Sequence, residues 1–265
     1  MRSILAHELS PSQAALWWLG QAGYVIRVAN LTVVIDPYLS DSAANGAAEF
    51  SRLFPVPIPP EELKADIYII THDHLDHLDP ETLNKYQHKQ NTIFIAPSLT
   101  AKKLLALGIP GTQVVIVNVG ETKEINGHVI SGIFALPTGA DVLDTTGYHI
   151  RFANGRNVYH TSDTQFHPLL FTSSPKAPEV MLVPINGKWG NPGPEQAAEL
   201  SHVLQPGFVM PNHYDMMELN AENPAVFKWF CAKMGMKEQC IIPERMQPFT
   251  WDVTNIKTHK DGSSN

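Results

Sequence analysis

The residues best suited to chemistry lie in "THDHLDHLDP", residues 71–80, directly after the apolar run "DIYII" at 66–70. Three histidines and three aspartates fall within eight consecutive positions of this segment. Imidazole and carboxylate groups bind divalent cations, and a strand end holds them in place without the cost of ordering a long loop. The spacing predicts a metal site that includes His72, His74, Asp76 and His77.

Two further strand ends carry candidate ligands. The run "NVYHT" at 157–161 is followed by Asp163, and the run "FVMP" at 208–211 is followed by His213. Taken alone, an aspartate in a turn is usually a cap, and a histidine after a strand is usually hydrogen-bonded or on the surface. Because the cluster at 71–80 predicts a divalent site, and such a site needs ligands from other strand ends, metal binding becomes the favoured role for both residues. We expect both residues to bind metal, with Asp163 able to reach two cations.

Three other polar residues are expected to support the site or the fold without binding metal. His160 lies in a strand three positions before Asp163, so packing or a hydrogen bond to a ligand is its expected role. Asp36, in "IDP", is expected to hold a ligand histidine or the turn below it. Asp79, directly before Pro80, is typical of a helix N-cap.

Composition narrows the range of partners. The chain has 265 residues, with 19 basic and 26 acidic side chains and a formal net charge of −7, so it lacks the basic footprint of a nucleic-acid-binding protein. No apolar run approaches the length that spans a bilayer, and the amino terminus lacks the pattern of a cleavable leader, so we expect a cytoplasmic protein that does not enter membranes. Cys231 and Cys240 fit no metal spacing and are expected to be ordinary buried thiols.

Short apolar runs alternate with helical patterns along the chain. Strands are expected at 16–19, 23–28, 31–35, 66–70, 92–96, 113–119, 128–136, 147–152, 157–161, 179–185 and 208–211. Helices are expected at 80–88, 98–107, 194–204 and 223–234. This pattern favours an α/β fold, an αββα sandwich of two mixed β-sheets with helices on the outer faces.

One domain is expected to span residues 1–253. The segment 51–60 is expected to be a surface loop, because repeated proline removes the backbone donors that a strand needs. The tail at 254–265 is poor in apolar residues and is expected to be disordered.

Over residues 15 to 245 the sequence resembles the metallo-β-lactamase superfamily. The resemblance rests on "WWLGQAGYVIR" at 17–27, "VVIDPYLSD" at 33–41, "THDHLDHLD" at 71–79, "VYHTSDT" at 158–164 and "MPNHYD" at 210–215. Within the superfamily it is most similar to the L-ascorbate-6-phosphate lactonase branch, which also has a double tryptophan before Leu-Gly. The resemblance implies that His72 and His74 belong to one metal position, that Asp76, His77 and His213 belong to a second, and that Asp163 bridges them.

One segment departs from the superfamily pattern. The superfamily usually places a further ligand histidine before the strand that begins at Gly147, and "ALPTGADVLDTTGYHI" at 135–150 has none there. The lactonase branch resembles this chain in placing an aspartate instead, and Asp141 is the expected match. Asp144 is the alternative ligand. Thr138 is expected only to face a metal-bound water. A hard oxygen ligand moves the preference from zinc toward manganese, so we expect two divalent cations, Mn²⁺ or Zn²⁺, or one if the segment supplies no ligand.

These expectations define a metal-dependent hydrolase. Two neighbouring cations lower the pKa of a shared water and polarise the bond under attack, so hydroxide is the nucleophile. Asp76 is the expected catalytic residue, which orients the hydroxide and then carries the proton to the leaving group.

Substrate selection is expected from the loop "PINGKWGNPGPEQAA" at 184–198. Lys188 near a helix start is suited to an anionic group, and Asn186 and Tyr214 are further candidates. We therefore expect a small anionic substrate, a lactone of a phosphorylated sugar acid. A phosphodiesterase acting on a lipid or nucleotide is the alternative, and a metal-holding binding protein without turnover is an alternative of another class. The oligomeric state is left open, a homo-oligomer included.

Overall fold

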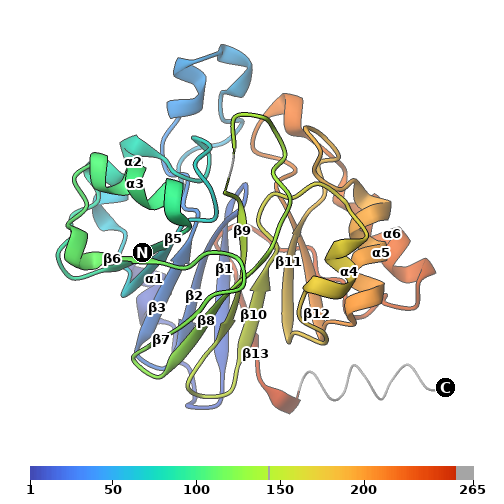
Figure 1. Cartoon of the computed structure of the whole chain (residues 1–265). Helices are drawn as coiled ribbons and strands as arrows, with labels where there is room; N and C mark the ends of the chain where they lie inside the picture. The colour runs from blue at the N-terminus through green and yellow to red at the C-terminus, as the bar shows by residue number, and fades with distance from the viewer. Residues whose placement is uncertain (143, 255–265) are drawn as a thin grey trace.

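Two β-sheets packed face to face form the centre of the molecule, and helices cover their outer faces (Figure 1). The computed structural model describes residues 1–142 and 144–254. In spatial order the seven-stranded sheet consists of β13 (Pro248–Trp251), β1 (Ala14–Gly20), β2 (Gly23–Val28), β3 (Leu31–Ile35), β4 (Ile67–Ile69), β5 (Ile93–Ala96) and β6 (Val114–Ile116). The six-stranded sheet consists of β12 (Phe208–Asn212), β11 (Val180–Pro184), β10 (Asn157–His160), β9 (Thr146–Arg151), β8 (His128–Phe134) and β7 (Thr122–Ile125).

The described helices are short. They are α1 (Arg2–Ala6), α2 (Pro80–Lys85), α3 (Ser98–Ala106), α4 (Leu169–Ser173), α5 (Pro194–Leu204) and α6 (Pro224–Lys233). The 3₁₀ turns are η1 (Ser42–Asn45), η2 (Ala48–Phe50), η3 (Pro60–Glu62), η4 (Gly111–Gln113) and η5 (Glu218–Asn220). No helix of the described residues is long and apolar enough to cross a membrane.

Both sheets are mixed, which brings several strand ends to one edge. In the larger sheet β1, β2 and β3 pair antiparallel, and β3 to β6 pair parallel. In the smaller sheet β7 to β10 pair antiparallel, and β10, β11 and β12 pair parallel. The carboxyl ends of neighbouring parallel strands lie at the same edge, where polar side chains from separate loops can meet.

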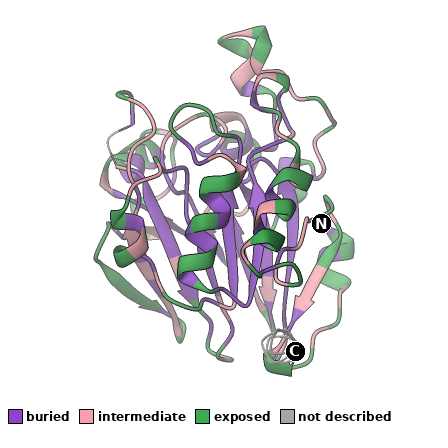
Figure 2. Ribbon diagram, turned by 90° about the vertical axis from the view of Figure 1, so that its right-hand side faces the viewer, coloured by how far each residue is buried: buried purple, intermediate pink, exposed green. Residues whose placement is uncertain are grey.

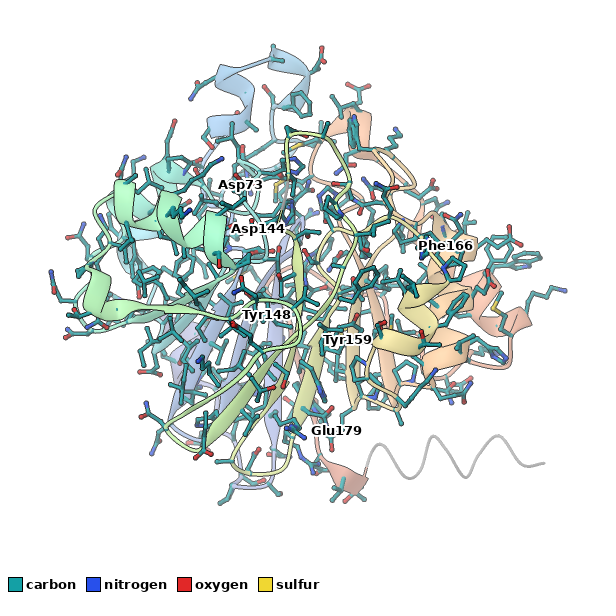
Figure 3. The ribbon with its side chains drawn as sticks, in the orientation of Figure 1. Asp73, Asp144, Tyr148, Tyr159, Phe166 and Glu179 are labelled. Carbon is teal, nitrogen blue, oxygen red and sulfur yellow. The ribbon has the colours of Figure 1, made fainter. Side chains whose placement is uncertain are left out.

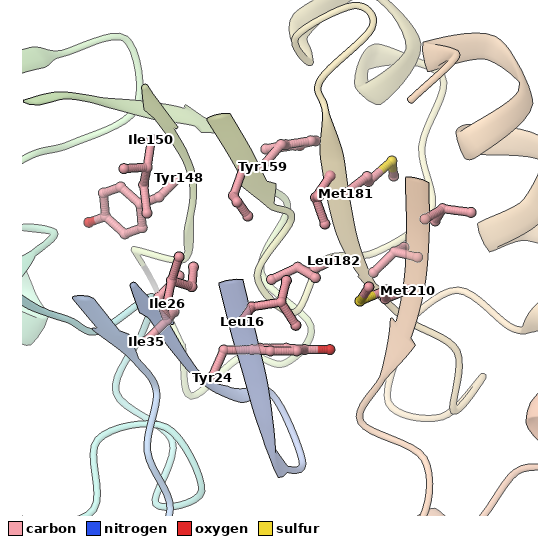
Figure 4. Close-up of a cluster of buried hydrophobic side chains, with 14 of the residues drawn as sticks. Leu16, Tyr24, Ile26, Ile35, Tyr148, Ile150, Tyr159, Met181, Leu182 and Met210 are labelled. Atoms are coloured by element: carbon pink, nitrogen blue, oxygen red, sulfur yellow. The ribbon is translucent and has the colours of Figure 1, made fainter. Parts of the chain in front are cut away.

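The strands are buried on both faces, because one face meets the other sheet and the other meets helices. In β1, Leu16 and Trp18 belong to the core between the sheets, whereas Trp17 and Leu19 belong to the core beneath the helices. Figure 4 shows side chains of the two sheets facing each other across the first of these cores. Figure 2 shows helices with exposed outer faces in front of buried strands. Each fully buried large aliphatic side chain contributes about 1.5–3 kcal/mol to folding.

The αββα prediction is confirmed, and the structure adds elements that the sequence pattern did not indicate. The strand β7 is exposed along most of its length and carries charge, so it lacks the alternation of a half-buried strand. The strand β13 begins at Pro248 at the sheet edge, where a missing N–H donor is tolerated. The helices α1 and α4 have only five residues each, too short for a helical period.

The structure tests the predictions for the helix cap at Asp79, for the two cysteines and for the segment 51–60. Asp79 is the N-cap of α2, and its Oδ1 accepts from the Glu81 backbone N–H at 3.0 Å, as predicted. Cys231 and Cys240 are buried and free, also as predicted. The segment 51–60 forms no named strand, but its later part is not a surface loop, because Ile58 is fully buried in the core beneath the helices. Residues 255–265 of the expected tail lie outside the described residues.

Candidate metal centre

Three separate loops bring histidine and aspartate side chains together at one edge of the two sheets. They are the loops after β4, β10 and β12, and the β1–β2 turn adds Gln21. His72 and His77 are fully buried, and Asp163 and His213 are at least 95% buried. Such burial of ionisable groups is rare unless they pair or bind metal.

The side chains form two overlapping groups of possible metal ligands. One consists of His72, His77 and Asp163, and the other consists of Asp76, His77 and His213, with ligand atoms within 4.8 Å of one another in each group. His213 Nε2 lies 3.1 Å from Asp163 Oδ2 and 3.2 Å from Asp76 Oδ2. His77 Nε2 lies 3.6 Å from Asp163 Oδ1. Asp163 therefore lies near His77, which belongs to both groups, and near His213, whereas His74 belongs to neither group.

Buried polar atoms without hydrogen bonds indicate whether a cation fits between these side chains. Among the described residues, His77 Nε2 and Asp163 Oδ1 are buried and make no hydrogen bond. A buried polar atom without a partner costs about 1–3 kcal/mol, so such atoms are rare without a reason. Both are lone-pair donors and they face each other, which is the arrangement that a divalent cation requires.

Asp36 fixes the orientation of His77 from the side away from the cavity. Its Oδ2 lies 2.7 Å from His77 Nδ1, and its Oδ1 accepts from the Thr71 backbone N–H at 2.8 Å. In the neutral ring, a carboxylate next to Nδ1 keeps the proton on that nitrogen, which leaves the lone pair of Nε2 directed at the two groups. The structure thus gives Asp36 the position that the sequence suggested.

Three amides that the sequence analysis missed hold the other ligands. Gln21 Nε2 donates to Asp76 Oδ2 at 2.7 Å, and Asn191 Nδ2 donates to Asp163 Oδ2 at 2.8 Å. Asn220 Nδ2 lies 2.7 Å from His213 Nδ1. The only sequence signal was "GQAG", where a polar residue stands between glycines in an otherwise apolar hairpin. Asn191 lies in a loop and Asn220 ends the short 3₁₀ turn η5, so their spacing in the sequence gives no signal.

The carboxylates dominate the electrostatics. Burial alone lowers the pKa of His77 and His213, but the neighbouring carboxylates outweigh it and raise the pKa of His77 to about 9 and that of His213 to about 10. Burial raises the pKa of Asp163 and Asp76, yet the same histidines shift both well below the usual range. For His72, burial is the largest cause and lowers the pKa. A cation in place of these protons satisfies the same carboxylates.

The segment that replaces the usual histidine lies at the edge of the centre. His74 Nδ1 lies 3.0 Å from His72 Nε2, and Asp141 Oδ2 lies 3.3 Å from the opposite nitrogen of His74. Asp141 is 76% exposed and belongs to neither group. The structure thus places Asp141 behind His74, whereas the sequence predicts that it binds metal beside that histidine.

The alternative residue of this segment, Asp144, is wrong as a ligand. Its carboxylate turns away to the first turn of α3, where it accepts from the Leu99 backbone N–H and from Thr100 Oγ1 at 3.3 Å (Figure 3). A carboxylate at a helix N-terminus satisfies free N–H groups and is favoured by the helix dipole. Thr138 lines the cavity described next.

A cavity of about 490 Å³ opens above the ligands. Its polar lining consists of Gln21, His74, Asp76, Thr138, Asp141, Asp163, His213 and Asn220. The remaining lining residues are small or apolar: Ala43, Gly46, Ala47, Phe50, Leu75, Gly139, Trp189 and Met217. The volume falls in the range of small-molecule sites.

Comparison with known proteins places this arrangement in a family. The sequence model of the Beta-lactamase superfamily domain matches residues 32–214. A UPF0173 metal-dependent hydrolase of Thermococcus onnurineus is 30% identical over 85% of this chain and 94% of its own length. Another of Thermoplasma acidophilum is 28% identical over 87% of this chain and 96% of its own length. The chain belongs to the UPF0173 family of the metallo-β-lactamase superfamily.

Solved structures agree with UPF0173 membership at the level of the fold. The metallo hydrolase Igni18 of Ignicoccus hospitalis superposes with a TM-score of 0.74 at 23% identity, over 91% of this chain and 99% of that chain. An isothiocyanate hydrolase from Delia radicum gut bacteria superposes with a TM-score of 0.73 at 17% identity, over 90% of this chain and 100% of that chain. The names of the UPF0173 relatives specify a metal-dependent hydrolase and no substrate.

The residues that the sequence analysis assigned to substrate lie away from the cavity lining of this UPF0173 chain. Lys188 Nζ donates to the Leu219 carbonyl, and Asn186 Nδ2 donates to Asn220 Oδ1 at 2.5 Å. Tyr214 is buried and stacks on Trp18 with ring centroids 5.0 Å apart. None of the three is among the described lining residues of this cavity, and their role in binding substrate stays a prediction.

His160 has a purely structural environment. Its Nε2 lies 3.0 Å from the Ala22 carbonyl, and its Nδ1 accepts from the Ser162 backbone N–H at 3.0 Å. Because both ring nitrogens contact backbone groups, His160 braces the β1–β2 turn and the turn that presents Asp163, which agrees with the packing role expected for it.

Proposed function

We propose that this UPF0173 chain is a hydrolase that holds two divalent cations and opens a lactone or a related ester. The observation that carries the proposal is the pair of overlapping ligand groups with facing, unsatisfied atoms on His77 and Asp163. By the resemblance, His72, His74 and Asp163 would hold one cation, and Asp76, His77 and His213 would hold the other together with Asp163. His74 lies outside both groups, and its Nδ1 is 3.0 Å from His72 Nε2. When bound, the cations supply Lewis acidity and a nucleophilic water at neutral pH.

The donor set favours zinc over manganese. A preference for manganese requires a hard oxygen ligand such as Asp141, and this carboxylate lies behind His74. The remaining donors are four imidazoles and two carboxylates, and imidazole-rich sites of this kind suit zinc.

The protein side chains would transfer the proton and orient the metal ligands. Asp76 lines the cavity and is held by Gln21, so its carboxylate is placed to take up a proton from the nucleophile and pass it to the leaving group. Gln21, Asn191 and Asn220 keep the ligand side chains in one orientation, so little reorganisation is needed during the reaction.

The test compares two neutralised aspartates of the same loop. Asp76→Asn should lower kcat/KM for a lactone by about 10²–10⁴-fold, the usual worth of a positioned acid–base group. Asp73→Asn is the matched control, because Asp73 pairs with Lys103 on α3 and belongs to neither ligand group. Metal content of each variant is measured alongside. Purified protein that binds no metal, or equal activity of the two variants, would contradict the proposal.

A further inference from the structure

The outer wall of the cavity is apolar and comes from three separate segments. Ala43 and Phe50 belong to the η1–η2 segment, Trp189 follows β11, and Met217 precedes η5. The rings of Phe50 and Trp189 lie with centroids 6.2 Å apart. Leu75, between the ligands His74 and Asp76, also lines the cavity and is 44% exposed. Any substituent that extends outward from the reacting bond therefore meets hydrocarbon and aromatic surface.

Among the residues that the structure describes, no lysine or arginine lines the cavity, and the ionisable lining residues are aspartates and histidines. The cations of the surrounding loops are already engaged. Lys188 donates to the Leu219 carbonyl, Arg52 Nη1 donates to the Tyr38 carbonyl at 2.7 Å, and Arg245 Nη1 pairs with Asp215 at 2.5 Å. A phosphate group placed away from the reacting bond would meet no lysine or arginine among the described lining residues and would lie near the exposed carboxylate of Asp141.

Trp189 has an unusual exposure and an unusual backbone conformation for a tryptophan. It is 51% exposed, although tryptophan is among the side chains with the most to gain from burial. Its φ of +51° is also in the left-handed region that a bulky side chain rarely adopts. Exposed aromatic rings at the mouth of a cavity are typical of ligand-binding walls.

We propose that the substrate is a neutral ester or lactone whose aromatic or aliphatic group lies against Phe50, Trp189 and Met217. This inference rests on the proposed hydrolase and replaces the phosphorylated sugar acid by an uncharged, apolar substrate class. The cavity volume of about 490 Å³ accommodates a fused bicyclic molecule.

The experiment compares three lactones with the metal-loaded protein. They are dihydrocoumarin, which is neutral and aromatic, glucono-1,5-lactone, which is neutral and polar, and 6-phosphogluconolactone, which is anionic. The expected order of kcat/KM places dihydrocoumarin first and the phosphorylated lactone last. Trp189→Ala should lower the ratio of kcat/KM for dihydrocoumarin over glucono-1,5-lactone by about 10-fold or more, mainly through KM, as the loss of a large apolar contact implies.

A matched variant and a binding measurement complete the test. Trp229→Ala is the control, because Trp229 is 54% exposed on α6 and contacts Phe230 and Lys233 instead of the cavity. It should leave the ratio unchanged. Chroman, which lacks the reactive carbonyl, should inhibit the wild type competitively and should bind Trp189→Ala at least about 10-fold more weakly.

The outcomes separate the two proposals. Preference for the phosphorylated lactone, or an unchanged ratio in Trp189→Ala, would overturn the substrate class while the hydrolase stands. Absence of turnover of all three lactones, with chroman still bound through Trp189, would overturn the lactone hydrolase and leave the apolar wall intact. Dissociation of an oligomer in Trp189→Ala would overturn the inference by identifying the wall as a subunit contact.

Discussion

Asp36 shows how a residue that never faces the cavity can decide what the centre binds. It is fully buried, its φ of +42° lies in the left-handed region, and both of its oxygens accept hydrogen bonds within the loop after β4. Backbone strain of this kind persists only where the surroundings enforce it, often at functional sites. Its contact with His77 Nδ1 sets the tautomer that exposes Nε2.

Asp36→Asn should weaken metal binding about 10–100-fold while the fold survives. Asparagine tolerates positive φ, but its NH₂ group next to His77 Nδ1 favours the tautomer with the proton on Nε2, which blocks that ligand atom. Competition with a chromophoric chelator measures the affinity, and circular dichroism measures the fold. Asp73→Asn serves again as the control. Equal metal affinity in Asp36→Asn and the wild type would show that His77 needs no such support.

For single residues, the sequence indicated the metal-ligand cluster but not the residues that orient the ligands. The spacing in 71–80 indicated ligands because several donors share one strand end. Gln21, Asn191 and Asn220 act only through contacts between loops that are distant in the chain, and no local pattern records such contacts. Lys188 illustrates the converse, since its position before a helix looked suited to an anion, yet its side chain is turned to the Leu219 carbonyl.

Among the elements, the β1–β2 hairpin has the most direct effect on the centre. Gly20 has a φ of +99°, and a Cβ there would lie 2.6 Å from Met216 Cε and 3.0 Å from Phe54 Cζ. The turn that follows presents Gln21, whose side chain holds Asp76 and whose carbonyl accepts from the His213 backbone N–H at 3.0 Å. One hairpin therefore joins the loop after β4 to the loop after β12.

Gly20→Ala should destabilise the protein by about 1–3 kcal/mol and should also lower lactone turnover, because strain and the clash with Met216 both displace Gln21. Gly155→Ala separates the two causes, since Gly155 has a φ of +85° but open space around its Cβ position. It should lose only the part due to backbone strain and keep its activity. Urea unfolding gives the stabilities. Equal losses of stability and activity in both variants would count against a role of the hairpin in the centre.

Element prediction succeeded where burial produced a pattern. Strands such as β4 and β11 are apolar throughout, because each is buried on both faces, and their runs were plain in the sequence. The edge strands β7 and β13 were missed, because exposure and proline remove the pattern that burial creates. Sheet order was not readable, since the partners of β10 and β1 are set by tertiary packing.

For the whole molecule, the centre exists only when both sheets are packed together. Asp36, His72, His74, Asp76 and His77 come from the larger sheet, whereas Asp163 and His213 come from loops of the smaller sheet. An unfolded chain therefore has no preformed site, and bound metal stabilises only the folded state. Metal binding and sheet packing should be coupled through Asp163.

Metal uptake should release protons and should strengthen as pH rises. In the metal-free protein, burial lowers the pKa of His77 and His213, but the carboxylates raise it to about 9 and about 10, so both rings are protonated at pH 7. Because these values exceed the unfolded value near 6.5, the charged rings stabilise the metal-free fold fully below about pH 6.5, and that stabilisation is lost as pH rises through about 9–10. A cation needs the neutral rings, so raising the pH weakens the metal-free fold and favours the bound state at the same time.

The gap in Tm between zinc-loaded and chelator-treated protein should therefore widen from pH 6 to pH 9. Calorimetry in two buffers of different ionisation enthalpy should detect about two protons released at pH 7. A gap in Tm that narrows with rising pH, or heats that do not depend on the buffer, would mean that the rings of His77 and His213 do not bind the cation.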